Sequence, residues 1–264
     1  MWNGILRSEL ALGFWQAGMA ALFALAIALA ARSRGIRLTG ETAVALGRGI
    51  VQIVAVGFIL AVLLRGPRWT SPFVLAAMTL AAGRIASRRA RRFPGAFRIS
   101  LYAIGLGAGS AIALMTALGV IKTSVSALIP VGSMVLANAM NANALALERF
   151  RSDVEAHAGE VESALALGAA PAVSVARYVQ SALSASLIPS INNLRSLGIV
   201  WIPGLMAGMV LSGASPLYAS VYQFAVIAMI LASSGLTCLI STYLMSGRAF
   251  SAAGQLVLRP GAGE

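Results

Sequence analysis

Long apolar runs, each followed by a short polar or basic segment, are the dominant pattern along the chain. A helix that crosses a bilayer needs about 20 mainly apolar residues. The sixth run is the weakest, because a proline and several polar residues precede it and shorten it. The pattern predicts about seven transmembrane helices, roughly at residues 10–31, 43–64, 71–86, 99–121, 124–147, 197–211 and 217–244.

Composition supports a membrane protein. Hydrophobic residues make up 59% of the 264 residues and charged residues only 11%, against about 25% in an ordinary soluble domain. A soluble protein with so few charged residues would have too little polar surface to cover its core. In a bilayer, lipid can face apolar side chains directly. We therefore expect an all-α integral membrane protein in which residues 1–264 form one transmembrane domain. Its expected location is the cell's inner (plasma) membrane, with the lipid bilayer as a partner.

The net charge of +12 does not indicate nucleic acid, because the basic residues lie in short clusters between the apolar runs. Cytoplasmic loops of membrane proteins carry an excess of Lys and Arg. Placing the N-terminus outside and the C-terminus inside leaves four of the 20 basic residues outside and 20 − 4 = 16 near the inner face. The outer residues are then Arg7, Arg65, Arg68 and Lys122, and the inner clusters are Arg32, Arg34 and Arg37, and Arg88, Arg89, Arg91 and Arg92.

Residues 148–180 differ from the rest of the chain. Residues 148–177 hold five of the eight acidic residues and the only histidine, His157. We expect 148–180 to form an extended cytoplasmic segment.

The sequence contains none of the common catalytic motifs. It lacks the H-E-x-x-H zinc motif and the phosphate-binding loop with its Gly-Lys-Ser/Thr ending. A catalytic triad would need His157, which lies among charged residues outside the apolar runs. An intramembrane aspartyl protease needs two Asp residues, and the sequence contains only Asp153. The single Cys238 allows no intrachain disulfide. We expect no catalytic residues and no cofactor in this chain, which favours a transporter or a membrane scaffold over an enzyme.

One short motif lies in the cytoplasmic segment. Glu162, Ala164 and Gly168 resemble the E-A-A-x-x-x-G loop of ABC transporter permeases, in which a short helix docks on a separate ATPase subunit. The Ile-x-Leu-Pro that often follows in importers is absent. The alternative is an interfacial helix that ends at a glycine. The candidate coupling residues are Glu160, Glu162, Ala164, Gly168, Ala169 and Pro171.

Polar residues inside the apolar runs are candidates for a substrate pathway, because they are costly in lipid. In the second run, Arg48 lies four residues before Gln52, and snorkelling to the headgroups is its alternative role. In the fifth run, Met134, Asn138 and Asn141 are three or four residues apart and share helix faces. Their alternative roles are interhelical hydrogen bonding and gap filling.

The sixth run adds Pro203, which with Gly204 suggests a broken helix lining a cavity. Close packing through Gly204 and Gly208 is the alternative. Met206 and Met209 lie on one face, and soft sulfur suits Cu(I) better than Fe(II). The candidate metal ligands are Asn138 and Met206, in a weak and transient site. Near the outer end of the seventh run, Tyr218, Tyr222 and Gln223 are expected to be interfacial anchors.

Five blocks in the right order resemble the Fet-type iron-export permeases, a family that includes the plant aluminium-sensitivity permeases. The resemblance implies a permease subunit that pairs with a cytoplasmic ABC ATPase, which binds ATP and Mg, with two copies of each. It implies export of iron or another metal, or of a nucleotide sugar or other small polar solute. The blocks are G-R-G-I-V-Q at 47–52, I-P-V-G-S-M at 129–134, N-A-M at 138–140, L-A-L-G-A at 165–169 and I-P-G-L-M-A-G at 202–208.

Overall fold

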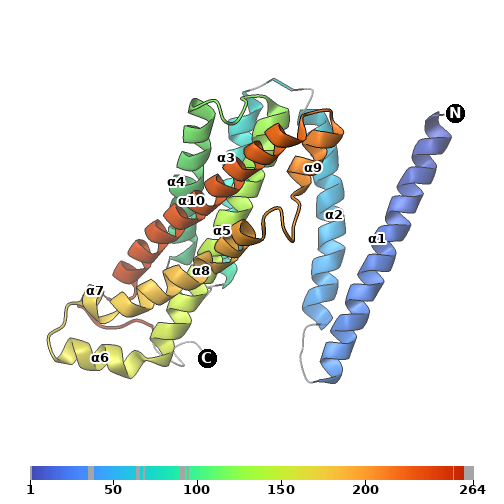
Figure 1. Cartoon of the computed structure of the whole chain (residues 1–264). Coiled ribbons are helices and arrows are strands. Elements are labelled where there is room, and N and C mark those ends of the chain that lie inside the picture. The colour runs from blue at the N-terminus through green and yellow to red at the C-terminus, as the bar shows by residue number, and fades with distance from the viewer. Residues whose placement is uncertain are drawn as a thin grey trace. The chain divides into compact units, whose positions relative to one another are not determined.

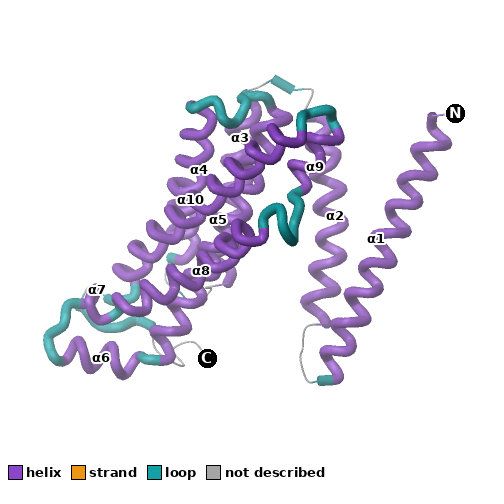
Figure 2. The backbone as a smooth tube through the Cα atoms, viewed as in Figure 1, coloured by secondary structure: helices purple, strands orange, loops and turns teal. Residues whose placement is uncertain are grey.

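The computed structural model describes residues 2–34, 39–63, 66–67, 69–89, 93, 95–251 and 253–258, with the side chains of 2–10, 39 and 41 left out. Within these ranges the chain is all helical, with two isolated β-bridges and no strand (Figures 1 and 2). The expected all-α membrane fold is therefore confirmed. The helices are α1 (Trp2–Ser33), α2 (Thr39–Leu63), α3 (Thr70–Arg89), α4 (Ala96–Ala117), α5 (Val125–Ala156), α6 (Ala158–Ala166), α7 (Pro171–Ser174), α8 (Ala176–Ser196), α9 (Gly204–Leu211) and α10 (Pro216–Arg248).

The chain divides into two compact units, Met1–Gly66 and Pro67–Glu264. The first holds α1 and α2, which contact each other. Both helices are long and apolar enough to cross a membrane, and almost none of their residues are buried within the protein. Their side chains therefore need lipid or another apolar surface. The expectation of one domain over residues 1–264 stays a prediction.

In the second unit, α5 is the central helix and packs against α3, α4, α8 and α10 (Figure 1). Its buried residues include Val135, Leu136, Leu147 and Phe150. Phe150 also contacts Phe93 edge-on, with ring centroids 6.2 Å apart. The apolar faces of the surrounding helices thus meet on α5, and this packing holds the unit together.

Five described helices are long and apolar enough to span a membrane: those within α1, α2, α4, α5 and α10. The helix α3 forms where the third span is expected, but it carries Arg84 and ends in Arg88 and Arg89. The number of spans and the N-out, C-in orientation stay predictions. Arg37, Arg65, Arg68, Arg91 and Arg92, which entered the charge argument, lie outside the described residues, as does the side chain of Arg7.

The sixth expected span, residues 197–211, is not one helix, and the break expected at Pro203 and Gly204 is present. Residues 197–203 form an irregular segment in which Gly198, at φ +76°, donates its N–H to the carbonyl of Trp201 at 3.0 Å. Pro203 then caps α9, which has only eight residues and is about 12 Å long. Proline has no N–H and its neighbour avoids helical angles, so the helix restarts after it.

A longer helix, α8, precedes this irregular segment. No span was predicted for the residues of α8, because many of them are polar. Its 21 residues pack against both α5 and α10. Ala182, Ser186 and Ser190 are buried at four-residue spacing, so one face of the helix is turned inward.

The described residues after α10, 249–251 and 253–258, fold back on the unit. Phe250 and Leu256 form an antiparallel bridge, and Val257 donates its N–H to the carbonyl of Ala249 at 2.9 Å. Leu256 and Leu258 are buried in the same cluster as Val175 and Tyr178. Two leucines in a short polar stretch give no periodic signal, so the sequence pattern does not predict this packing.

The helices α4 and α10 approach each other closely at Gly107. A Cβ on this residue would lie 2.7 Å from the Cα of Thr237. Because backbone atoms cannot move aside, only glycine fits at this crossing.

We expect Gly107→Ala to lower the free energy of unfolding by roughly 1–3 kcal/mol, because it overpacks the crossing. Gly109→Ala is the matched control, since a Cβ there meets nothing within 4 Å. Thermal unfolding of the purified proteins in detergent compares them. Equal midpoints for the two variants would contradict this account of the α4–α10 contact.

Candidate functional site

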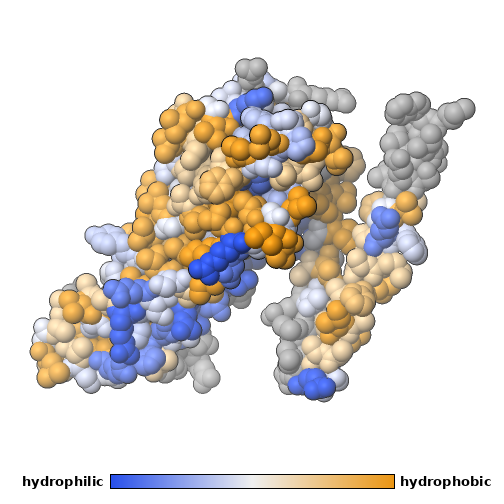
Figure 3. Space-filling view, viewed as in Figure 1, coloured by the Kyte–Doolittle hydropathy of each residue, from blue (hydrophilic) through white to orange (hydrophobic). Residues whose placement is uncertain are grey.

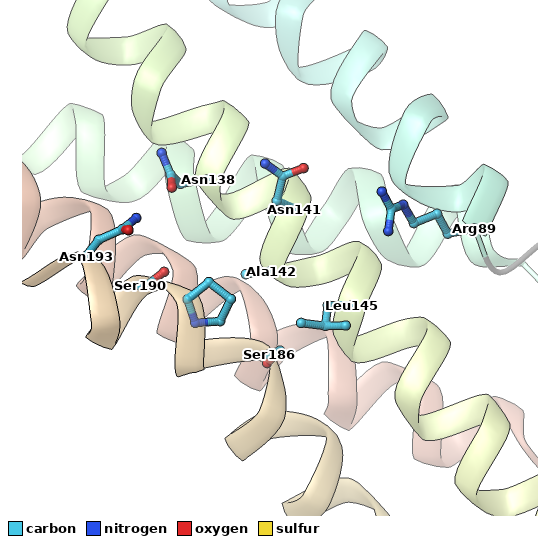
Figure 4. Close-up of a pocket in the computed structure, with 9 residues that line it drawn as sticks. Arg89, Asn138, Asn141, Ala142, Leu145, Ser186, Ser190 and Asn193 are labelled. Atoms are coloured by element: carbon cyan, nitrogen blue, oxygen red, sulfur yellow. The ribbon is translucent and has the colours of Figure 1, made fainter. Parts of the chain in front are cut away.

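A cavity of about 330 Å³ lies between α5 and α8, with the end of α3 at its side (Figure 4). Its wall combines amide, hydroxyl and guanidinium groups with a somewhat larger apolar surface. Its lining residues are Arg89 from α3, Asn138, Asn141, Ala142 and Leu145 from α5, and Ser186, Pro189, Ser190 and Asn193 from α8.

The wall on α8 is built by helical spacing. Ser186, Ser190 and Asn193 are four and three residues apart, which places them along one face. Pro189 lies inside the helix and has no N–H, so the carbonyl of Ala185 loses its usual helical donor. These residues were missed from the sequence, although their spacing could have identified them.

The wall on α5 contains two of the predicted pathway residues. Asn138 is half-buried and donates a hydrogen bond from Nδ2 to the carbonyl of Met134 at 2.8 Å, which leaves its Oδ1 available. Asn141 is exposed toward the cavity. Asn143 has a different role, since it is fully buried and donates to Ser100 Oγ of α4 at 2.9 Å. It therefore links two helices rather than lining the cavity.

Arg89 is the charged residue of the cavity wall. It extends from α3, with its guanidinium on the side of Asn141 (Figure 4). Its Nη1 lies 3.9 Å from Glu148 Oε2, and the two side chains are 64% and 49% exposed. Such an exposed, long ion pair is weak, so the guanidinium can still contact a ligand.

The other predicted pathway residues do not line this cavity. Met134 packs beside the apolar cluster around Val135, and Met206 accepts a long hydrogen bond from Ser220 at 3.9 Å. Met209 lies on α9, which begins after the buried Pro203. Arg48 and Gln52 are exposed on α2, in the other unit. Roles for these residues in a pathway or a metal site stay predictions.

Gln223 is not an interfacial anchor, because it is only 1% exposed. Neither atom of its amide has a hydrogen-bond partner among the described residues. It belongs to a buried polar face of α10 that continues at Ser234, Thr237 and Ser241. Tyr218 is exposed and stacks on Tyr222 with ring centroids 6.3 Å apart.

The expected cytoplasmic segment begins inside α5 and ends inside α8. Between them, α6 ends in a Schellman motif. Gly168 donates its N–H to the carbonyl of Leu165 at 2.9 Å, and Ala169 donates its N–H to the carbonyl of Ala164 at 3.0 Å. Gly168 has φ +89°, which other residues rarely adopt. Pro171 then begins α7. The glycine six positions after Glu162 therefore ends the short helix.

Glu160 fixes α6 to α8. Arg177 Nη2 lies 2.7 Å from Glu160 Oε2, and the hydroxyl of Tyr178 donates to the same oxygen at 3.2 Å. His157 stacks on Tyr178 and donates from Nδ1 to the carbonyl of Asp153 at 2.8 Å. Burial raises the pKa of Tyr178, Arg177 lowers it and Glu160 adds to the rise. At neutral pH the phenol is thus a hydrogen-bond donor.

The turn between α6 and α7 presents apolar side chains to the outside. Leu167 is 90% exposed, and Val173 on α7 is also exposed. Figure 3 shows more hydrophilic colour toward the end of the unit that carries α6 and α7 than along its apolar sides. The turn therefore carries an apolar side chain that a partner protein could bury.

The fold and the site define an all-helical, multi-pass membrane protein with a polar cavity between two of its helices. Residues 14–250 match the model of the uncharacterised protein family UPF0014, and the chain belongs to this family. No solved structure matches the chain.

Named relatives resemble almost the whole chain. The UPF0014 membrane protein STAR2 of Oryza sativa subsp. japonica is 35% identical over 255 residues, covering 92% of this chain and 89% of that protein. ALUMINUM SENSITIVE 3 of Arabidopsis thaliana is 31% identical, covering 85% and 82%. The probable iron export permease protein FetB of Escherichia coli (strain K12) is 30% identical, covering 80% and 82%. The resemblance inferred from the sequence blocks is confirmed.

We expect Gly168→Val to loosen the turn after α6, because a left-handed conformation costs a residue with a Cβ about 1–2 kcal/mol. Gly159→Val is the matched control, since neither position has an atom within 4 Å of a Cβ and only Gly168 has positive φ. Hydrogen exchange of residues 158–174 measures the effect. Equal protection in the two variants would show that the turn does not depend on glycine.

Proposed function

We propose that this chain is the permease subunit of an ABC exporter in which a separate cytoplasmic subunit hydrolyses ATP. The proposal rests mainly on one observation: α6 and α7, with the exposed turn between them, directly connect α5 to α8, the two helices that form the cavity walls. A partner that moves this connection therefore acts on both walls. The name of FetB, a probable iron export permease, supports a transport role.

The contacts within this connection suit it to transmit movement. Glu160 joins α6 to Arg177 on α8, and Ser181 on α8 donates to Asp153 Oδ2 on α5 at 2.9 Å. Arg149 also lies 3.1 Å from Asp153 Oδ2. Since these contacts join three elements, a force on the turn displaces the ends of α5 and α8 together.

In the proposed complex, the turn docks in a groove on the ATPase, with Leu167 as its apolar contact. The coupling residues are the six predicted from the sequence, Glu160, Glu162, Ala164, Gly168, Ala169 and Pro171. ATP and Mg bind to the partner, and two copies of each subunit form the transporter in the inner (plasma) membrane. The N-terminus lies outside and residues 148–180 lie inside, in accordance with the basic clusters.

The proposed cargo is iron or another metal, in line with the name of FetB. A second candidate, a small polar solute such as a sugar phosphate or nucleotide sugar, is favoured by the amides, hydroxyls and guanidinium of the cavity wall. Flux into inside-out vesicles that contain both subunits tests transport: ATP-dependent uptake of any of these solutes supports an exporter. A complex that hydrolyses ATP but moves none of them would favour a scaffold.

We expect Leu167→Ser to weaken assembly with the ATPase by about tenfold or more, because burial of a leucine side chain contributes about 1.5–3 kcal/mol. Leu211→Ser is the matched control, since Leu211 is 89% exposed and also ends a short helix. Co-purification and ATPase activity in the reconstituted complex measure assembly. Loss of assembly in Leu211→Ser alone would place the docking surface elsewhere.

We expect cells that lack the protein to accumulate the metal, and Asn138→Leu to reproduce this defect, because it removes an amide from the cavity wall with little change in volume. Met206→Leu tests the sulfur ligand and should have the smaller effect on a hard ion. Total metal content by mass spectrometry is the measurement. If neither variant changes it, the polar-solute candidate gains support.

A further inference from the structure

The cavity contains hydrogen-bonding groups that the protein itself does not use. Among the described residues, the side chains of Asn141, Ser190 and Asn193 have no hydrogen-bond partner. Ser190 is only 6% exposed. Asn141 and Asn193 are exposed, and together these three side chains offer both donors and acceptors to a ligand.

The charge of the wall opposes a bare metal ion. Among the described lining residues, Arg89 alone is charged, and its ion-pair partner Glu148 does not line the cavity. The described residues hold no group of three or more His, Cys, Asp or Glu side chains that could bind a metal. The thiol of Cys238 is fully buried behind Ser186, whose hydroxyl lies 3.3 Å from its Sγ. A divalent cation here would meet neutral amides beside a guanidinium.

The size of the cavity leads to the same conclusion. Direct coordination places oxygen ligands about 2.0–2.6 Å from a metal ion. The cavity volume of about 330 Å³ corresponds to roughly ten water molecules, at about 30 Å³ each in the liquid. This space is larger than a bare ion needs, and it can hold a ligand with several oxygen atoms of its own.

We infer that the cavity binds a small hydroxyl-bearing oxyanion, either free or as the chelator of a metal ion, with Arg89 as its charged contact. The inference rests on the proposed export function and specifies the form in which the cargo is bound. The guanidinium pairs with a carboxylate or phosphate group. Asn141, Ser190 and Asn193 hydrogen-bond to the remaining oxygen atoms, and the chelator rather than the protein neutralises the metal.

Isothermal titration of the full chain in nanodiscs tests this with four probes: ferric citrate, citrate, glucose 1-phosphate, and Fe(II) chloride without a chelator. We expect at least one oxyanion to bind and Fe(II) alone not to bind. Preferred binding of ferric citrate identifies a metal chelate, whereas preferred binding of glucose 1-phosphate identifies a sugar phosphate. Binding of Fe(II) alone, or of no probe, overturns the inference.

Variants at two adjacent arginines make the test specific. Arg89→Gln should weaken oxyanion binding about tenfold, since a hydrogen bond to a charged group contributes about 1.5–3 kcal/mol, and Arg89→Lys should restore part of it. Arg88→Gln removes the same charge from an exposed residue outside the cavity and should change affinity less than about twofold. Equal effects of Arg88→Gln and Arg89→Gln overturn the assignment.

ATP-driven flux distinguishes this inference from the proposed function. Transport of bare Fe(II) by the complex, with no effect of Arg89→Gln, would overturn the oxyanion site and leave the exporter intact. Hydrolysis with no flux of any of the four probes would count against both.

Discussion

The absence of water in the hydrocarbon layer is the constraint on which the structure depends. Helices satisfy their own backbone groups there, and hydroxyl side chains bond to the preceding turn: Thr79 to the carbonyl of Leu75, Thr116 to that of Ile112, and Thr242 to that of Cys238, at 2.7–2.8 Å. The amides between α5 and α8 differ from these hydroxyls, because Asn141 and Asn193 are exposed at the cavity rather than bonded within their own helices. In the inferred site, an incoming ligand would bond to them.

In the proposed transporter, the same two helices explain how one chain would combine a solute site with a docking surface. The helix α5 runs from the apolar cluster around Val135, past Asn141, to Asp153, and α8 runs back from Tyr178 to Asn193. Each helix thus carries cavity residues along its length and partner-facing contacts at its end. Opening and closing the cavity requires only that two rigid elements change their relative position, which is the usual form of alternating access.

Apolar runs and charge predicted the fold class and most helices, because length and hydropathy determine what can lie in lipid. The short helix and glycine turn at residues 158–168 were also recognisable, since a positive φ restricts the sequence strongly. The break in the sixth expected span was recognisable from Pro203 and Gly204, but the irregular path of the residues before it was not. The helix α8 was missed because its buried face contains serines, and the low hydropathy of serine argues against a buried position.

The site itself was only partly predictable. Asn138 and Asn141 were selected because amides are conspicuous in an apolar run, and they do line the cavity. From the sequence, Arg89 was assigned to the basic cluster that predicts the orientation in the membrane. Nothing in the sequence distinguishes an arginine that lines a cavity from one that lies in a loop. Asn143, equally conspicuous, bonds to Ser100 of α4. Successive side chains on a helix point in directions about 100° apart. Tertiary packing therefore decides which asparagine lines the cavity and which one bonds to a neighbouring helix.

The return of residues 249–258 to the unit has a consequence for biogenesis. Leu256 and Leu258 complete the apolar cluster that supports Val175 and Tyr178, yet they are translated only after the whole of α10. During synthesis, the base of α7 and α8 therefore lacks part of its core until α10 has entered the membrane. In the proposed complex, chains in which α10 is not inserted would present an incomplete surface to the ATPase, so assembly would select for molecules whose insertion is finished.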